Sequence, residues 1–120
     1  FRYDAAKHIE LPDDDKSYAS DFWTVVLNNG AQFQYGEILQ GGADRIKDYS
    51  KIMSVTASSY GGQVRSAIIN KSLEIANWSN YSASGVDESK LVTWVESHDN
   101  YCNDGSWAQL DEQDINGHGR

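Results

Sequence analysis

The stretch "FRYDAAKH", residues 1–8, opens the chain with the pattern of a β-strand. Aromatic and small side chains alternate with charged ones, which is the two-residue period of a strand (Phe1, Tyr3 and Ala5 against Arg2 and Asp4). The strand ends in charged residues, so it carries reactive side chains to its carboxyl end. The same arrangement returns twice further along the chain and sets the expected fold.

Outward from this stretch, strand-like and helix-like segments take turns. We predict strands at 1–5, 33–39, 54–62 and 91–97, and helices at 22–29, 46–53, 63–73 and 107–115, with Ser20 or Asp21 capping the first helix and a helical turn at 87–90. Such alternation is typical of an α/β fold with right-handed βαβ units and a parallel sheet. In these folds functional side chains collect at the carboxyl ends of the strands, where Asp4, Glu37 and Asp99 are expected.

Composition narrows the classes of partner. The 120 residues suit one small domain, and a formal net charge of −8 would repel a phosphate backbone, so no nucleic-acid partner is expected. No apolar run approaches the roughly 20 residues that span a bilayer, so no membrane partner is expected. Cys102 is the single cysteine and is interpreted as a spectator. The three histidines are too far apart in sequence for a zinc-binding motif.

The carboxylates near the strand ends suggest acid–base chemistry. Arg2 and Asp4 share one strand face, and a guanidinium beside a carboxylate favours its ionised form, which suits a nucleophile. Glu37 stands among apolar neighbours that favour the protonated form, which suits a proton donor. One ionised and one protonated carboxyl group are what glycoside hydrolysis needs. Because the chain has 18 acidic residues, of which most are expected to be solvated, surface charges are the preferred explanation of this pattern taken by itself.

Three segments resemble, in order, signature segments of the α-amylase family, glycoside hydrolase family 13: "FRYDAAKH", "FQYGEIL" and "VTWVESHDNY". The spacing between them also matches, and the likeness looks closest to secreted bacterial α-amylases of the Bacillus subtilis type. The resemblance implies a (β/α)₈ barrel. Residues 1–120 would then be a partial catalytic domain, from about the fourth strand to the start of the seventh helix.

The resemblance also implies roles for individual residues. Asp4 matches the catalytic nucleophile, Glu37 the general acid/base, and Asp99 the third carboxylate, which binds sugar hydroxyls. Arg2 matches the arginine that orients the nucleophile, and His98 a histidine that bonds the sugar at the cleavage point.

Two further residues of the first segment match family positions on the leaving-group side. Lys7 and His8 match substrate contacts, although a lysine and a histidine at a strand end are often simply solvated. The backbone carbonyl of His8 matches a ligand of a structural calcium ion, the one cofactor implied. The alternative interpretation of His98, without a role in catalysis, is a loop histidine hydrogen-bonded to the backbone. His98 and Asp99 can face one site only if the chain leaves strand geometry at Ser97 or His98.

The implied activity is endo-acting hydrolysis of α-1,4-glucans, starch or malto-oligosaccharides, with retention of configuration. Retention requires the Asp4 and Glu37 carboxyl groups to lie about 5–5.5 Å apart. The alternatives are a glucanotransferase of the same family and a non-catalytic carbohydrate-binding module. The parent enzyme is expected to be secreted and monomeric, whereas the isolated chain, an internal fragment on this interpretation, is expected to be inactive and aggregation-prone.

Several other features are explained by packing or solvation at least as well as by a role in binding or catalysis. Trp23 and Trp94 are expected to pack rather than bind sugar, and the aspartates at 13–15 are expected to be a solvated loop rather than a cation site. Tyr101 and Trp107 suit packing at least as well as stacking on a glucose ring. The last five residues, "NGHGR", cannot continue the predicted helix at 107–115 and need not be native sequence.

Overall fold

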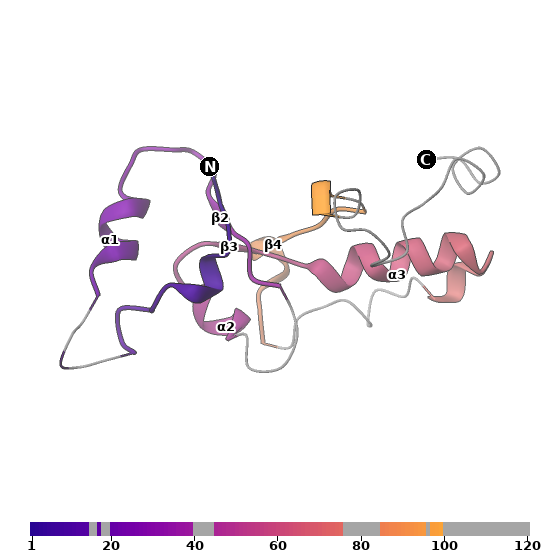
Figure 1. Cartoon of the computed structure of the whole chain (residues 1–120), viewed down its shortest axis with the longest axis horizontal. Coiled ribbons are helices and arrows are strands. Elements are labelled where there is room, and N and C mark those ends of the chain that lie inside the picture. The colour runs from indigo at the N-terminus through magenta and orange to yellow at the C-terminus, as the bar shows by residue number, and fades with distance from the viewer. Residues whose placement is uncertain (15–16, 18–19, 40–44, 76–84, 96, 100–120) are drawn as a thin grey trace. The chain divides into compact units, whose positions relative to one another are not determined.

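A computed structural model describes residues 1–14, 17, 20–39, 45–75, 85–95 and 97–99. The chain forms two compact units. The first, called here the sheet unit, comprises Phe1–Thr56 and Ala83–Val92; the second, the helical unit, comprises Ala57–Ser82 and Thr93–Arg120. A parallel four-stranded sheet alternating with helices confirms the predicted α/β class (Figure 1).

The sheet is built from four short strands in sequence order. These are β1 (Arg2–Tyr3), β2 (Tyr35–Gly36), β3 (Ser54–Thr56) and β4 (Leu91–Val92), and every neighbouring pair is parallel. Tyr3 pairs with Gly36, and Gly36 with Val55. Each strand covers part of the range predicted for it, because pairing stops where the side chains turn polar or the chain bends away.

Short helical segments connect the strands of the sheet unit: η1 (Ala6–His8), α1 (Phe22–Leu27), α2 (Ile46–Tyr49) and η3 (Glu88–Lys90). Asp21 occupies the N-cap position of α1 without a side-chain hydrogen bond, whereas the Ser20 hydroxyl accepts the Phe22 N–H at 3.4 Å. At η3 the Asp87 carboxylate accepts the Ser89 N–H at 2.9 Å, which confirms the predicted turn at 87–90.

The core of the sheet unit lies on the sheet face that carries Gly36 and Val55. Trp23 is 2 % exposed and meets both Tyr3 and Tyr49 edge to face, so the predicted packing role of Trp23 is confirmed. A Cβ at Gly36 would lie 2.6 Å from the Met53 sulfur, so only glycine fits against this core. Its buried members are Ala6, Leu11, Trp23, Ile38, Tyr49, Met53 and Val55.

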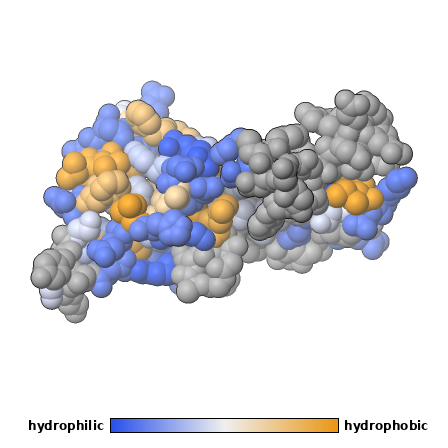
Figure 2. All heavy atoms as spheres, in the orientation of Figure 1, coloured by the Kyte–Doolittle hydropathy of each residue, from blue (hydrophilic) through white to orange (hydrophobic). Residues whose placement is uncertain are grey.

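Some large apolar side chains of the sheet unit stay exposed. Phe1 is 72 % exposed, Val25 64 % and Phe33 56 %. On the face drawn in Figure 2, hydrophobic residues form patches between hydrophilic ones. A single exposed apolar residue is ordinary, but among its described residues this small unit exposes seven: Phe1, Ile9, Phe22, Val25, Phe33, Leu39 and Ile52.

The helical unit contains α3 (Ser58–Ile69) and η2 (Leu73–Ile75). The predicted start of this helix at residue 63 is wrong, because Ser58 to Gly62 are helical rather than strand-like. Gly61 and Gly62 disfavour a helix by their intrinsic propensity, but close packing of the backbone at Gly61 against Trp94 and Val95 requires the small residue. Tertiary packing thus overrides local preference.

The predicted strand at 91–97 is also shorter than expected. β4 ends at Val92, and His98 and Asp99 are helical. In the described part of the chain, no helix has the length and apolar character needed to cross a membrane. The predictions for the helix at 107–115, Tyr101, Cys102, Trp107 and the last five residues lie outside the described residues.

Candidate active site

Two candidate carboxylates come together at the carboxyl ends of β1 and β2. Asp4 directly follows β1 and Glu37 directly follows β2. The guanidinium of Arg2 bonds both of them: Nη1 lies 2.5 Å from Asp4 Oδ1, and Nη2 lies 3.1 Å from Glu37 Oε1. One cation therefore bridges two carboxylates that are far apart in the sequence, as the parallel pairing of their strands requires.

The two carboxylates differ in exposure. The side chain of Asp4 is 73 % exposed and that of Glu37 is 12 % exposed. The second oxygen of Glu37, Oε2, accepts the backbone N–H of Ala5 at 2.8 Å. Although Glu37 is largely buried as predicted, its oxygens meet hydrogen-bond donors rather than the apolar groups expected from its neighbours in sequence.

Arg2 is held in its charged form by these partners. Partial burial acts to lower the pKa of its guanidinium, but the hydrogen bond to Asp4 and the charges of Glu37 and Asp4 outweigh burial and raise it above its ordinary value. A permanently charged group between two carboxylates reduces their mutual repulsion. It also fixes the direction in which each of them points.

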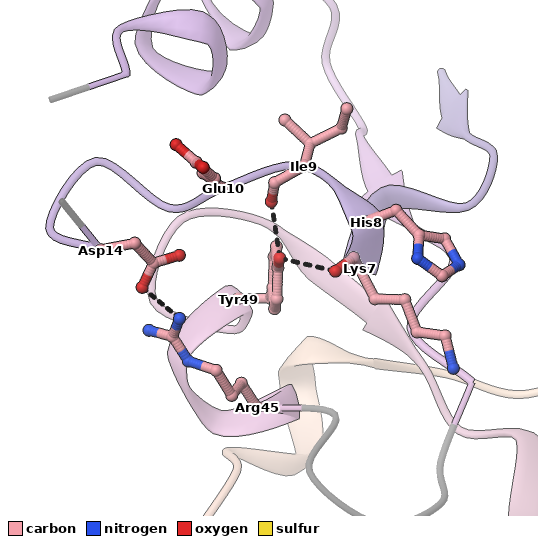
Figure 3. A pocket seen from close by; sticks show the side chains of 7 residues that line it. All are labelled: Lys7, His8, Ile9, Glu10, Asp14, Arg45 and Tyr49. Carbon is pink, nitrogen blue, oxygen red and sulfur yellow. Dashed lines mark hydrogen bonds and ion pairs between the residues drawn. The ribbon is translucent and has the colours of Figure 1, made fainter. Parts of the chain in front are cut away.

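Lys7 and His8 lie in η1 and line an open pocket of about 240 Å³ together with Ile9, Glu10, Asp14, Arg45 and Tyr49 (Figure 3). Tyr49 lies at the back of this pocket. Its hydroxyl is 2.6 Å from the Ile9 carbonyl oxygen and 3.1 Å from that of Lys7, so its single proton is donated to the carbonyls on either side of His8. Burial, with a contribution from the Asp14 charge, raises the pKa of the Tyr49 phenol and keeps that proton in place.

An ion pair closes the other end of the pocket. The Arg45 guanidinium bonds the Asp14 carboxylate, and Asp14 also accepts the Leu11 N–H at 2.7 Å (Figure 3). The bond from Arg45 and the bond from Leu11 lower the pKa of Asp14. Asp14 is thus part of a folded loop, whereas the sequence alone indicated a solvated run of aspartates.

His98 and Asp99 belong to the helical unit. His98 Nε2 lies 3.4 Å from Asp99 Oδ1, so the two side chains turn toward each other. The chain leaves strand geometry after Val92, which is earlier than Ser97 or His98, where the sequence analysis required the change. The role of Asp99 as the third carboxylate stays a prediction.

The segment before His98 is held against α3 inside the helical unit. Arg65 is 7 % exposed, and its guanidinium donates to the Val95 carbonyl oxygen. A Cβ at Gly61 would lie 2.5 Å from the Trp94 carbonyl oxygen and 2.9 Å from that of Val95. Gly61 and Arg65 are one helical turn apart, so a single face of α3 carries both contacts.

The implied calcium ion can be tested against the side chains of the described residues. Calcium takes about six to eight oxygen ligands. Among the residues that the structure describes, no group of three or more His, Cys, Asp or Glu side chains could hold a metal ion. The His8 carbonyl could supply one oxygen, so these residues do not form a calcium site by themselves, and no chemical step is derived through the metal.

Sequence reasoning missed two groups of residues near the site. Tyr49 carried only the signal of helical spacing, and Arg45 gave no local sign of its partner Asp14, which lies 31 residues away. Tyr3 and Gln34 appeared only as strand residues, yet their side chains are hydrogen-bonded to each other. Each pairing depends on the fold, so pattern within one segment could not have revealed it.

Proteins named alpha-amylase are among the known proteins that this chain resembles. The chain is 39 % identical to a protein named alpha-amylase from Butyrivibrio fibrisolvens, with 93 % of the chain matched, and 41 % identical to a protein named alpha-amylase from Clostridium acetobutylicum, with 84 % matched. The chain spans only 15 % and 14 % of the length of these relatives. No protein-family model matches it. The two matches support an amylase-related family for this chain.

Proposed function

We propose that the chain is part of a retaining α-1,4-glucan hydrolase of glycoside hydrolase family 13, of the Bacillus subtilis α-amylase type, that acts within starch or malto-oligosaccharide chains. One observation carries the proposal: Arg2 bonds both Asp4 and Glu37 at the carboxyl ends of neighbouring parallel strands. The two relatives named alpha-amylase support the substrate class. We call the full-length protein that carries this chain the complete enzyme.

The mechanism proceeds in two displacements. In the first, a protonated Glu37 gives its proton to the glycosidic oxygen while an Asp4 oxygen attacks the anomeric carbon, so the C–O bond breaks and a glycosyl ester forms. In the second, the Glu37 carboxylate removes a proton from water, which attacks the same carbon and releases Asp4. Two inversions give net retention.

The contacts of Glu37 suit the second displacement directly. One of its oxygens lies in an ion pair with Arg2 and the other accepts the Ala5 N–H, which is the arrangement of the ionised carboxylate. A proton on Oε1 would point at the Arg2 guanidinium. We therefore infer that the contact between Arg2 and Glu37 opens when Glu37 acts as the acid, while Arg2 stays on Asp4.

The remaining family features are proposals of the same kind. A sheet whose strands run in sequence order, all parallel, is compatible with a segment of a (β/α)₈ barrel. In that barrel Lys7 and His8 would contact the leaving-group sugar, and His98 and Asp99 the sugar at the cleavage point. The His8 carbonyl would be one ligand of a structural calcium ion, and the complete enzyme would be a secreted monomer.

The stereochemistry of the product tests the mechanism. Proton NMR of the complete enzyme acting on malto-oligosaccharides should show the α-anomer of the reducing sugar first, followed by slow mutarotation. Product analysis separates the two activities of the family, because cyclic or lengthened glucans would indicate transfer to sugar and free reducing ends hydrolysis. Initial formation of the β-anomer would disprove the double displacement.

A variant pair tests the residue that carries the proton. Replacing Glu37 with Gln should lower kcat by about 10²–10⁴-fold, because the amide can neither give nor take the proton. The matched control is Glu74→Gln, which changes an exposed carboxylate in η2 of the helical unit. If the complete enzyme kept its activity with Glu37→Gln, a non-catalytic carbohydrate-binding role of this chain within it would become the better explanation.

A further inference from the structure

The side chains behind the candidate catalytic face form a polar cluster, made of Tyr3, Asn29 and Gln34 and called here the corner cluster. The Tyr3 hydroxyl donates to Gln34 Oε1. The Asn29 amide nitrogen lies 2.9 Å from the Tyr3 hydroxyl and 2.9 Å from Gln34 Oε1. Three side chains from β1, from the loop after α1 and from the approach to β2 therefore share one set of hydrogen bonds.

The corner cluster also ties down the end of α1. Gln34 Nε2 donates to the Leu27 carbonyl oxygen at 2.9 Å, and the Asn29 amide nitrogen lies 2.8 Å from the Val26 carbonyl oxygen. Carbonyl groups in the last turn of a helix have no partner within the helix, so these bonds satisfy groups that would otherwise need water. The helix end and both strands are thereby joined through a few side chains.

The position of the corner cluster relative to the catalytic residues follows from strand geometry. Side chains alternate along a strand, so Tyr3 points to the opposite face from Arg2 and Asp4, and Gln34 to the opposite face from Glu37. Tyr3 stands between Arg2 and Asp4 in sequence. Any displacement of Tyr3 therefore moves both the candidate nucleophile Asp4 and its ion-pair partner Arg2.

The backbone pairing of these two strands is short. β1 and β2 contain two residues each. Around them the Phe1 amino group donates to the Phe33 carbonyl oxygen at 2.8 Å, the Tyr35 N–H to the Phe1 carbonyl oxygen at 3.0 Å and the Glu37 N–H to that of Tyr3 at 2.8 Å. A slip of one residue would turn Asp4 to the opposite face and remove it from Glu37. Short pairings resist such a slip weakly, and side-chain bonds across them add the missing specificity.

We propose that Tyr3 and Gln34 are positioning residues that set the register of β1 against β2 and thereby hold Arg2, Asp4 and Glu37 in their working geometry. The proposal rests on the proposed function of that site. Neither residue touches the reacting atoms; each acts through the backbone it fixes. The hydroxyl of Tyr3 is the critical group, because its ring also packs against Trp23 and that contact would survive its removal.

The test is a double-mutant cycle in the complete enzyme with Tyr3→Phe and Gln34→Leu. Each single variant should lower kcat by about tenfold with KM changed by less than about twofold, since small misplacements of catalytic groups cost rate rather than binding. The double variant should lose little more than the worse single variant, because both remove the same bond. A kcat within about twofold of wild type in both single variants, with only the melting temperature reduced, would overturn the proposal.

A second pair of variants leaves both strands unchanged and covers the case in which the strand variants fail to fold. Asn29→Ala removes a donor from the corner cluster and should lower kcat. The control is Asn28→Ala, which changes the preceding residue; the side chain of Asn28 makes no hydrogen bond to any residue that the structure describes. Equal kcat for these two variants would count against the proposal.

Glu37→Gln is measured alongside to separate the two proposals. If Glu37→Gln is inactive and Tyr3→Phe has normal activity, only the positioning role fails. If Glu37→Gln is fully active, the proposed function fails and the positioning role fails with it.

Discussion

The two places that carry candidate catalytic carboxylates are built in different ways. In the sheet unit, Asp4 and Glu37 follow paired strands and are held by a charged group, Arg2, that bonds both. In the helical unit, the segment at 93–95 before Asp99 lies beyond the end of β4, where Gly61 approaches it closely and the buried Arg65 donates to the Val95 carbonyl oxygen. The positions of Asp4 and Glu37 therefore depend on charge and hydrogen-bond geometry. The position of the segment before Asp99 depends on the small volume of the residue at Gly61. Each should therefore fail under a different kind of substitution.

The largest effect is expected where the charge geometry of the sheet unit is broken. Arg2→Lys keeps the positive charge, but a lysine ammonium cannot span two carboxylates with two fixed nitrogens as the guanidinium does. We expect kcat of the complete enzyme to fall by about 10²-fold, in line with the loss of orientation of Asp4. Steady-state kinetics check this, and a kcat near that of wild type would show that charge alone suffices.

A smaller effect is expected where the volume of the helical unit is changed. Gly61→Ala places a methyl group 2.5 Å from the Trp94 carbonyl oxygen, so it should destabilise the fold by about 1–3 kcal/mol. Gly62→Ala is the matched control, because its Cβ would meet only Arg65 Nη2 at 3.9 Å, and it should stabilise by about 0.5–1 kcal/mol through helix propensity. Urea unfolding of both variants measures the difference. Equal stabilities would mean that α3 does not approach this segment closely.

The smallest effect concerns the loop beside Lys7 and His8. Its Asp14 has a pKa lowered below 3.8 by Arg45 and by the Leu11 N–H, so the ionised form stabilises the fold. This contribution is present above pH 3.8 and is lost as the pH falls through the lower pKa of the folded state. We expect Asp14→Asn to reduce the melting temperature at neutral pH and to converge with wild type in acid.

Asp13→Asn serves as the control for this pH dependence, because it removes a neighbouring carboxylate and leaves the bond between Asp14 and Arg45 intact. Its melting temperature should track that of wild type at every pH. Since the pair between Asp14 and Arg45 is partly exposed, added salt should shrink the effect of Asp14→Asn. A difference that persisted once the Asp14 carboxyl group is protonated in the folded state would assign the stabilisation to packing rather than to charge.

Much of the fold could be predicted from periodicity, because alternation at residues 1–5 and 33–39 and helical spacing around Ile46 reflect burial on one face. The start of α3 could not, since Gly61 and Gly62 argue locally against a helix. Only the carbonyl groups of Trp94 and Val95 explain why glycine is needed there. Composition predicts element type where local and tertiary preferences agree, and fails where close packing decides.

The contacts of the candidate site also differ in whether they can be predicted from the sequence. The pairing of Arg2 with Asp4 follows from strand alternation over two residues. The contact of Arg2 with Glu37 needs the register of β1 against β2, and the bond between Asp14 and Arg45 needs the whole sheet unit to be folded. Contacts between residues distant in sequence are set by topology, and no pattern within one segment encodes them.

The most direct test of the account is to trap the covalent intermediate. The reagent is a fluorinated α-glycosyl fluoride, whose glycosyl ester with the enzyme forms quickly and is hydrolysed slowly. It should label the complete enzyme once, and peptide mass spectrometry should place the sugar on Asp4. The label should disappear in Asp4→Asn. A label on Glu37 or on any other residue, or label that persists in Asp4→Asn, would contradict the assignment of Asp4 as the nucleophile held in place by Arg2.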